Sequence, residues 1–158
     1  MTMRAEVVVA SNRAAAGVYA DETGPVIVAF LQRLGFTVDA PVVVPDGAPV
    51  GEAIRAGAEG GARVVLTTGG TGLTPTDQTP EQTRAVLDRE APGIAEAIRA
   101  AGVAQGVPTA ALSRGTAGVV GSCLVVNLPG SRGGVLDGLA VLEPMLLHAV
   151  EQVVGSDH

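Results

Sequence analysis

The sequence has few aromatic residues, no lysine and one cysteine. Phe, Tyr and Trp make up 2 % of the 158 residues, so the core must be built from aliphatic side chains and alanine. All ten basic residues are arginine, and the net charge is −6. Because no basic stripe is interleaved with stacking aromatics, we expect no nucleic-acid partner.

The lone cysteine, Cys123, excludes an intramolecular disulfide, and no cluster of cysteine and histidine has the spacing of a zinc site. Cys123 begins an apolar run, where a small buried strand residue is the expected structural role.

Long hydrophobic runs are also absent. None approaches the ~20 residues that a membrane-spanning helix needs, and the first residues lack the layout of a signal peptide. We therefore expect a cytoplasmic protein that does not contact a membrane.

Four short, valine-rich runs without alternation are typical of parallel strands that are covered on both faces. The segments between them have helical spacing, and so the chain is predicted to be one α/β domain over residues 1–158 with a mostly parallel sheet. A strand pair is expected around residues 114–116. The predicted strands are residues 7–10, 42–44, 64–66 and 124–126, and the predicted helices are residues 26–34, 50–58, 79–87, 92–101 and 135–153.

The third run leads into the most informative segment, a loop rich in glycine and threonine that ends in Asp77 and a helix start. Thr79 is predicted to be the N-cap, with Pro80 as the first helical residue and Gln82 completing a capping box. Loop amides and a helix N-terminus favour anionic oxygens. Asp77 would repel phosphate, and a divalent cation bound between the two would remove this repulsion.

Polar residues follow all four predicted strands at their carboxyl ends, where ligands bind in open α/β sheets. Ser11, Asp46 and the glycine loop follow the first three runs, and residues 127–131 follow the fourth. Their convergence predicts a binding site with two carboxylates, hydroxyls and backbone amides.

Each element also has a purely structural interpretation. Asp46 is a common turn residue, Asp77 stabilises a helix N-terminus, and the glycines permit positive φ. Residues 127–131 are compatible with a turn and an N-cap at Ser131, and Arg132 with either a phosphate contact or a solvated side chain. A P-loop is excluded because it needs a lysine, and a Ser-His hydrolase is disfavoured because His148 is expected on a helix face.

These motifs resemble the MoaB and Mog proteins of molybdenum cofactor biosynthesis, and the gephyrin G domain. The resemblance extends from Val7 to the last helix. It is carried by Leu-Thr-Thr-Gly-Gly-Thr-Gly at residues 66–72, Asp77 with Thr-Pro-Glu at 79–81, Val-Pro-Asp at 44–46, Leu-Ser-Arg at 112–114 and Asn-Leu-Pro-Gly-Ser at 127–131.

The resemblance implies a three-layer α/β/α molybdopterin-binding fold that assembles as a homotrimer. It also implies Mg²⁺-dependent adenylyl transfer from ATP to the terminal phosphate of molybdopterin, with possible hand-over of the product to a molybdenum insertase. The family's two essential aspartates correspond to Asp46 and Asp77, which are the expected catalytic and metal-binding residues. The expected substrate-binding residues are Ser11, Thr68, Gly69, Gly70, Thr71, Gly72, Ser113, Asn127, Pro129, Gly130 and Ser131.

Many relatives carry a basic residue directly before the motif aspartate, where this chain has Thr76. This difference leaves two alternatives open: a molybdopterin-binding carrier of the MoaB type, and a nucleotide-hydrolysing relative similar to competence-damage proteins.

Overall fold

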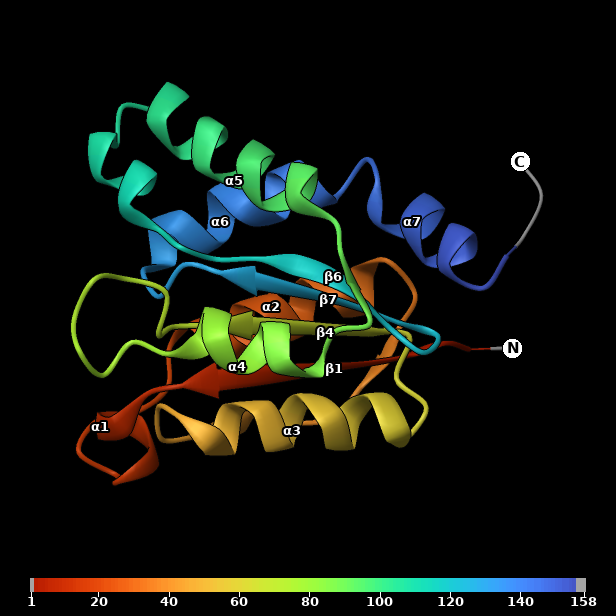
Figure 1. Ribbon diagram of the computed structural model, residues 1–158, viewed down its shortest axis with the longest axis horizontal. Helices are drawn as coiled ribbons and strands as arrows, with labels where there is room; N and C mark the ends of the chain where they lie inside the picture. Colours follow the sequence, from red (N-terminus) through yellow and green to blue (C-terminus); the bar gives the residue numbers. More distant parts are fainter. Residues whose placement is uncertain (1, 156–158) are drawn as a thin grey trace.

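The computed structural model describes residues 2–155, which form a seven-stranded mixed sheet between two layers of helices (Figure 1). The strands are β1 (Arg4–Ala10), β2 (Thr37–Val38), β3 (Val42–Val44), β4 (Val64–Thr68), β5 (Arg89–Glu90), β6 (Ala117–Val120) and β7 (Cys123–Leu128). The helices are α1 (Asn12–Ala15), α2 (Thr23–Arg33), α3 (Ala48–Glu59), α4 (Thr79–Val86), α5 (Pro92–Ala104), α6 (Arg132–Leu142) and α7 (Leu146–Val153), with a 3-10 helix η1 (Pro108–Leu112).

The sheet order is β2-β1-β4-β7-β6-β5, and β3 also pairs with β1. Strands β1, β2, β3, β4 and β7 run parallel, whereas β6 is antiparallel to both β5 and β7. The four predicted runs are therefore confirmed as β1, β3, β4 and β7, and the predicted mostly parallel α/β class is confirmed. Strands β2 and β5, which have two residues each, were not predicted.

Both faces of the sheet are covered, and this explains why the strands lack alternation. In β1, Val7 and Val9 pack into the core beneath α2, α6 and α7, while Val8 and Ala10 pack into the core beneath α3 and α4. Figure 1 shows α2 and α3 on opposite sides of β1 and β4. Cys123 lies buried at the start of β7, as predicted, and burial raises the pKa of its thiol to about 12.

The long C-terminal helix predicted over residues 135–153 is wrong. The chain forms α6 and α7, which are bent by 64° at their junction. Pro144 lies between them, and proline has no N–H to donate and disfavours helical backbone in the residue before it. Within residues 2–155, no single helix is long and apolar enough to cross a membrane; only this bent pair, taken together, reaches that length and composition.

Two local predictions also need correction. The N-cap of α4 is Gln78 rather than Thr79, and no side-chain hydrogen bond caps this helix. Residues 114–116 connect η1 to β6, and the hairpin instead joins β6 to β7. The tight turn of this hairpin contains Gly121 with φ of 55°, a conformation that glycine adopts without strain.

Candidate functional site

The carboxyl ends of β1, β3, β4 and β7 lie side by side, as predicted. Ala10 pairs with Val44, Val9 pairs with Thr68, and Thr68 pairs with Leu128. The residues that follow these positions therefore leave the sheet along one edge. They lead into Ser11, Asp46, the glycine loop (residues 69–77) and the segment 129–131, respectively.

Two pockets open at this edge. The first, here called the Asp77 pocket, has a volume of about 410 Å³ and is lined by the glycine loop, α5, η1 and the start of α6. The second, here called the Ser11 pocket, has a volume of about 390 Å³ and is lined by the end of β1, the segment before α2 and the start of α6. Both pockets share Gly130 and Ser131.

Most of the predicted site residues line one of these pockets. The Asp77 pocket contains Gly70, Thr71, Gly72, Asp77, Ser113 and Pro129. The Ser11 pocket contains Ser11, Thr68 and Gly69. The structure thus brings together residues from three strand ends, and only Asp46 and Asn127 lie outside the linings of both pockets.

The glycine loop passes closely between the two aspartates. A Cβ added at Gly70 would lie 2.8 Å from Asp46 Oδ1, and a Cβ added at Gly72 would lie 2.8 Å from Asp77 Oδ2. Gly69 and Gly70 also have φ of 90° and 69°, which only glycine adopts readily. Glycine is therefore needed here for both the backbone turn and the space beside the carboxylates.

Asp46 carries a buried carboxylate oxygen, Oδ1, that has no hydrogen-bond partner. Burial raises the pKa of Asp46, and the negative charge of Asp77 raises it further. The structure thus places the two carboxylates within electrostatic range of each other, although they follow different strands. Such an arrangement is costly without a cation, and it is typical of functional sites.

Side-chain hydroxyls at the ends of β1, β4 and β7 form local hydrogen bonds at this edge. The Thr68 hydroxyl donates to the Pro129 carbonyl at 2.6 Å, which ties the end of β4 to the segment 129–131. The Ser131 hydroxyl accepts from Gly134 N–H at 3.1 Å and caps α6, as predicted. Ser11 likewise caps α1, accepting from Ala14 N–H at 3.2 Å.

Asn127 has only internal contacts. Its Nδ2 donates to the hydroxyls of Thr67 and Thr83 at 2.9 and 3.0 Å, and its Oδ1 accepts from Thr116 N–H at 3.0 Å. The residue is 3 % exposed. These bonds join α4 to β4, to β7 and to Thr116, which precedes β6. That Asn127 contacts a ligand stays a prediction.

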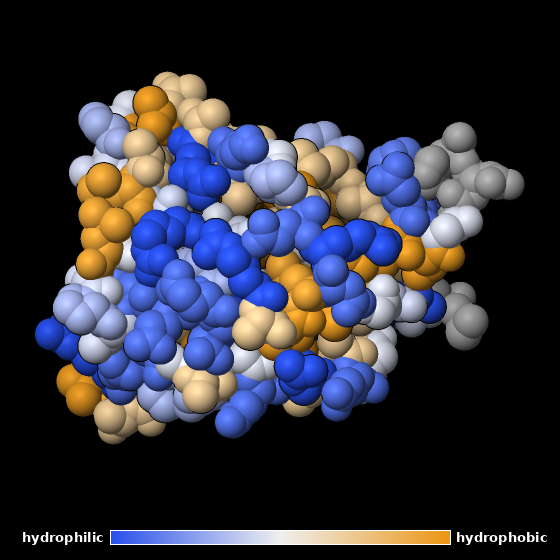
Figure 2. Space-filling model, in the orientation of Figure 1, coloured by the Kyte–Doolittle hydropathy of each residue, from blue (hydrophilic) through white to orange (hydrophobic). Residues whose placement is uncertain are grey.

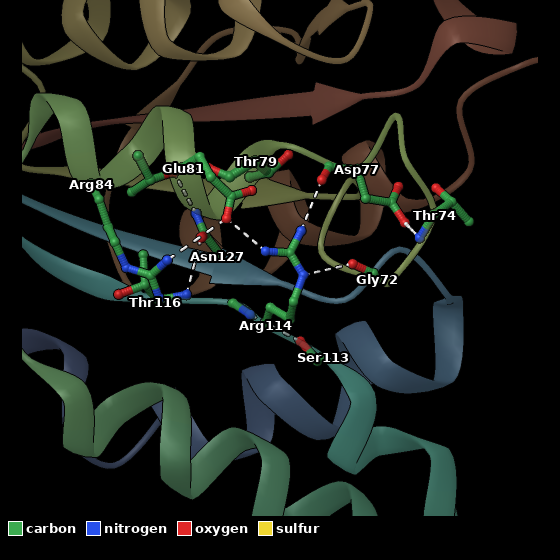
Figure 3. A network of polar contacts seen from close by, with 12 residues as sticks. Gly72, Thr74, Asp77, Thr79, Glu81, Arg84, Ser113, Arg114, Thr116 and Asn127 are labelled. Carbon is green, nitrogen blue, oxygen red and sulfur yellow. Dashed lines mark hydrogen bonds and ion pairs between the residues drawn. The ribbon is translucent and has the colours of Figure 1, made fainter.

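Figure 3 shows a residue whose contacts sequence reasoning missed, Arg114, at the centre of a polar network. Its guanidinium donates to the carbonyls of Gly72 and Asp77, each at 2.8 Å, and to Glu81 Oε2 at 2.6 Å. The bond from Arg114 lowers the pKa of Glu81. The resemblance included Arg114 within a motif, but only the fold reveals these partners.

Thr79 is the second missed residue. It is fully buried at the first position of α4, and its Oγ1 has no hydrogen-bond partner. The same oxygen would collide with a Cβ at Gly70, as would Asp46 Oδ1. The two unpartnered oxygens therefore flank one point of the glycine loop. No sequence signal distinguishes this hydroxyl from an ordinary N-cap.

Comparisons with known proteins identify the family and the fold. Residues 6–148 match the family described as a probable molybdopterin binding domain. The fold is similar to the molybdopterin biosynthesis Mog protein from Mycobacterium ulcerans, with 49% identity, a TM-score of 0.93 and 99% of each chain covered.

Two curated relatives extend the comparison. The chain is 39% identical over 155 residues to a molybdenum cofactor biosynthesis bifunctional protein of Synechococcus elongatus, covering 98% of this chain and 48% of that protein. It therefore spans about half the length of that relative. It is also 32% identical over 154 residues to a molybdopterin adenylyltransferase of Pyrococcus furiosus, covering 95% of this chain and 90% of that protein.

The family model covers most of the chain, and the Mog structure superimposes along nearly its whole length. The resemblance found in the sequence is thereby confirmed. This chain belongs to the molybdopterin-binding domain family of molybdenum cofactor biosynthesis, which includes the Mog and MoaB proteins.

Proposed function

We propose that this protein transfers AMP from ATP to the terminal phosphate of molybdopterin in a Mg²⁺-dependent reaction. The observation that carries the proposal is the pair of pockets that meet at Gly130 and Ser131 beside the glycine loop. A transfer reaction needs two substrates whose reacting groups meet, whereas a carrier needs one site. The name of the Pyrococcus furiosus relative supports the same activity.

In the proposed step, a phosphate oxygen of molybdopterin attacks the α-phosphorus of ATP. A new phosphorus–oxygen bond forms, the bond between the α-phosphorus and its bridging oxygen to the β-phosphate breaks, and pyrophosphate leaves. Both reactants are anions, so the largest catalytic contribution is expected to be preorganised neutralisation of charge.

The residues present fit a divalent cation. Asp46 Oδ1 is buried and unpartnered, and Asp77 is near enough to raise the pKa of Asp46. The described residues 2–155 contain no group of three or more His, Cys, Asp or Glu that could hold a metal. Two carboxylates suffice for Mg²⁺, which is usually bound by one or two carboxylates together with substrate phosphates. When bound, the cation would neutralise phosphate charge.

The backbone of the glycine loop is proposed to bind phosphate through the amides of residues 69–72, aided by the Thr71 hydroxyl. The loop carbonyls are already used inside the protein. Gly70 O accepts from Thr79 N–H at 3.0 Å, and Thr71 O accepts from Arg114 N–H at 2.8 Å. Ser113 and the segment 129–131, which also line the Asp77 pocket, are proposed to contact the substrates.

A product assay tests the proposal. Purified protein is incubated with molybdopterin, ATP and Mg²⁺, and both adenylylated molybdopterin and pyrophosphate are measured. The proposal expects both products in equal amounts and none when EDTA is added. Molybdopterin retained without pyrophosphate release would instead identify a carrier, and AMP released without molybdopterin would identify a nucleotide hydrolase.

We also propose a homotrimer that hands its product to a molybdenum insertase, on the basis of the family resemblance. The chain exposes several large apolar side chains, including Val18 at 70 % and Leu73 at 65 %. Sedimentation equilibrium tests the assembly, and a monomer at all concentrations would contradict it.

A further inference from the structure

We propose that Arg114 is a positioning residue that fixes Asp77 for cation binding through the backbone of the glycine loop. This inference rests on the metal role given to Asp77 in the proposed function. The hydrogen bonds that Arg114 makes to this segment go to the backbone that carries the Asp77 carboxylate, at the Gly72 and Asp77 carbonyls.

One guanidinium holds both ends of the loop segment that carries Asp77. Nε donates to the Gly72 carbonyl and Nη2 donates to the Asp77 carbonyl, each at 2.8 Å. The Arg114 N–H also donates to the Thr71 carbonyl at 2.8 Å. The intervening residues, 73–76, are all exposed. The Arg114 guanidinium therefore joins the two ends of an exposed loop.

Bonds within the loop do not replace this attachment. Asp77 N–H donates to the Thr74 carbonyl at 3.0 Å, and Thr74 N–H donates to Asp77 Oδ2 at 3.2 Å. Both bonds join loop residues to each other, so neither attaches the segment to the sheet. The Arg114 bonds attach the loop segment to the sheet, because Arg114 lies just before strand β6.

Glu81 orients the guanidinium. Its Oε2 accepts from Arg114 Nη1 at 2.6 Å, and the ion pair leaves Nε and Nη2 directed at the two carbonyls, as Figure 3 shows. Arginine suits this role because its planar fork presents several donors in fixed directions, which lysine cannot do. Figure 2 shows hydrophilic side chains gathered across the middle of the face that α4 covers.

Arg84, which lies on α4 with Glu81, provides a matched control for Arg114. It lies 3.8 Å from Glu81 Oε2 and donates to Glu90 Oε1 at 2.8 Å. In Figure 3 it lies on the opposite side of Glu81 from Asp77. Removing either arginine takes one positive charge from Glu81, but only removal of Arg114 releases the loop carbonyls.

The direction in which cation affinity changes when Arg114 is removed distinguishes a positioning role from a purely electrostatic one. Loss of a positive charge near two carboxylates should by Coulomb's law strengthen the binding of a cation. Loss of a positioning contact should weaken it, and removal of a residue that orients a metal ligand typically costs 10–100-fold in affinity. The two explanations thus predict opposite changes.

The experiment measures Mn²⁺ binding alone, by the electron paramagnetic resonance signal of free Mn²⁺, at a temperature where each variant is fully folded. We expect Arg114→Ala to weaken Mn²⁺ binding about 10-fold, and Arg114→Lys, which retains the charge, to weaken it in the same direction. We expect Arg84→Ala to bind Mn²⁺ as the wild type does. A melting curve for each variant reports stability separately.

The following outcomes overturn the inference: unchanged or stronger Mn²⁺ binding in Arg114→Ala, full restoration by Arg114→Lys, or no Mn²⁺ binding by the wild type. If Arg114→Ala fails to fold, Arg114→Lys and Glu81→Gln are measured in its place, and unchanged binding in both overturns it. Weaker binding in the Arg114 variants without AMP transfer by the wild type would support the inference and contradict the proposed function. AMP transfer by the wild type, together with unchanged Mn²⁺ binding in the Arg114 variants, would support the proposed function and contradict the inference.

Discussion

Two buried polar clusters lie along α4, one at Thr83 and one at Thr79, and they differ in how their hydrogen bonds are satisfied. In the first, Asn127 uses both its amide nitrogen and its oxygen, bonding to Thr67, Thr83 and the backbone of Thr116. In the second, Asp46 Oδ1 and Thr79 Oγ1 are buried beside Gly70 without partners. Because buried polar groups are normally paired, the first cluster fits a structural role and the second fits a ligand site.

The comparison predicts that mutations in the two clusters affect different properties. A satisfied network contributes stability, and its loss leaves several groups unpaired. An unsatisfied carboxylate costs stability in the free protein and is retained where function requires it. The first cluster should therefore control melting, and the second should control ligand binding and turnover.

The largest expected effect is on turnover in Asp46→Asn. We expect adenylyl transfer to fall about 10²–10³-fold, equivalent to roughly 3–4 kcal/mol, because a preorganised electrostatic partner is lost. The metal-free variant should melt no lower than the wild type, since burial and Asp77 both penalise the ionised carboxylate. Steady-state kinetics and thermal melting in EDTA measure the two quantities.

Asp77→Asn is the companion variant, and it is expected to lose turnover to a similar extent. Mg²⁺ should raise the melting temperature of the wild type, because a ligand that binds only the native state stabilises it, and should not raise that of Asp46→Asn. Wild-type turnover in either variant would remove the assigned role of that carboxylate.

The second prediction concerns stability. Asn127→Leu has a similar shape but leaves the Thr116 N–H and two threonine hydroxyls without their amide partner. At about 1–3 kcal/mol for each unsatisfied buried group, we expect a loss of roughly 3 kcal/mol in the free energy of unfolding. Urea denaturation measures it. A loss below that of an exposed substitution such as Arg84→Ala would show that the network is not needed for stability.

Two threonines of the same helix sharpen the comparison further. Thr79 and Thr83 are both fully buried in α4, but of their two hydroxyls only that of Thr83 has hydrogen-bond partners. It donates to the Thr79 carbonyl at 2.7 Å and accepts from Asn127 Nδ2 at 3.0 Å. We expect Thr83→Val to destabilise by about 1–2 kcal/mol and Thr79→Val to be neutral or stabilising. Paired urea titrations check this, and equal losses would contradict the distinction.

Much of the fold could be predicted from local composition. Valine-rich runs without alternation indicated buried parallel strands because a strand covered on both faces has no polar side. The two-residue strands β2 and β5 could not be predicted in this way, since their pairing depends on neighbours that the fold supplies. The break between α6 and α7 was recoverable from Pro144, but the spacing of apolar residues continues through it.

The site was predictable to the extent that strand ends locate it. The convergence of Ser11, Asp46 and the glycine loop follows from parallel strands sharing one edge. The roles of Thr79 and Arg114 were not predictable, because they depend on contacts between segments that are distant in sequence. Thr79 also fits a familiar capping pattern, which the structure does not form.

The smallest expected effect is a pH dependence that distinguishes Glu81 from Asp46. The Arg114 bond lowers the pKa of Glu81, so this carboxylate stabilises the fold above its ordinary pKa and loses that contribution as pH falls through the lowered value. Burial and Asp77 raise the pKa of Asp46, so its ionisation costs stability as pH rises through the raised value.

In EDTA, the melting temperature of Glu81→Gln should therefore lie below that of the wild type at pH 7 and approach it as pH falls toward 3. The melting temperature of Asp46→Asn should match or exceed that of the wild type at pH 7, and any excess should shrink below pH 4. The Glu81 effect should be small because its side chain is 49% exposed and water screens the pair. If the melting temperatures of both variants depended on pH in the same way, the two carboxylates would have equivalent surroundings. The contrast between the paired Glu81 and the unpaired Asp46 would then be wrong.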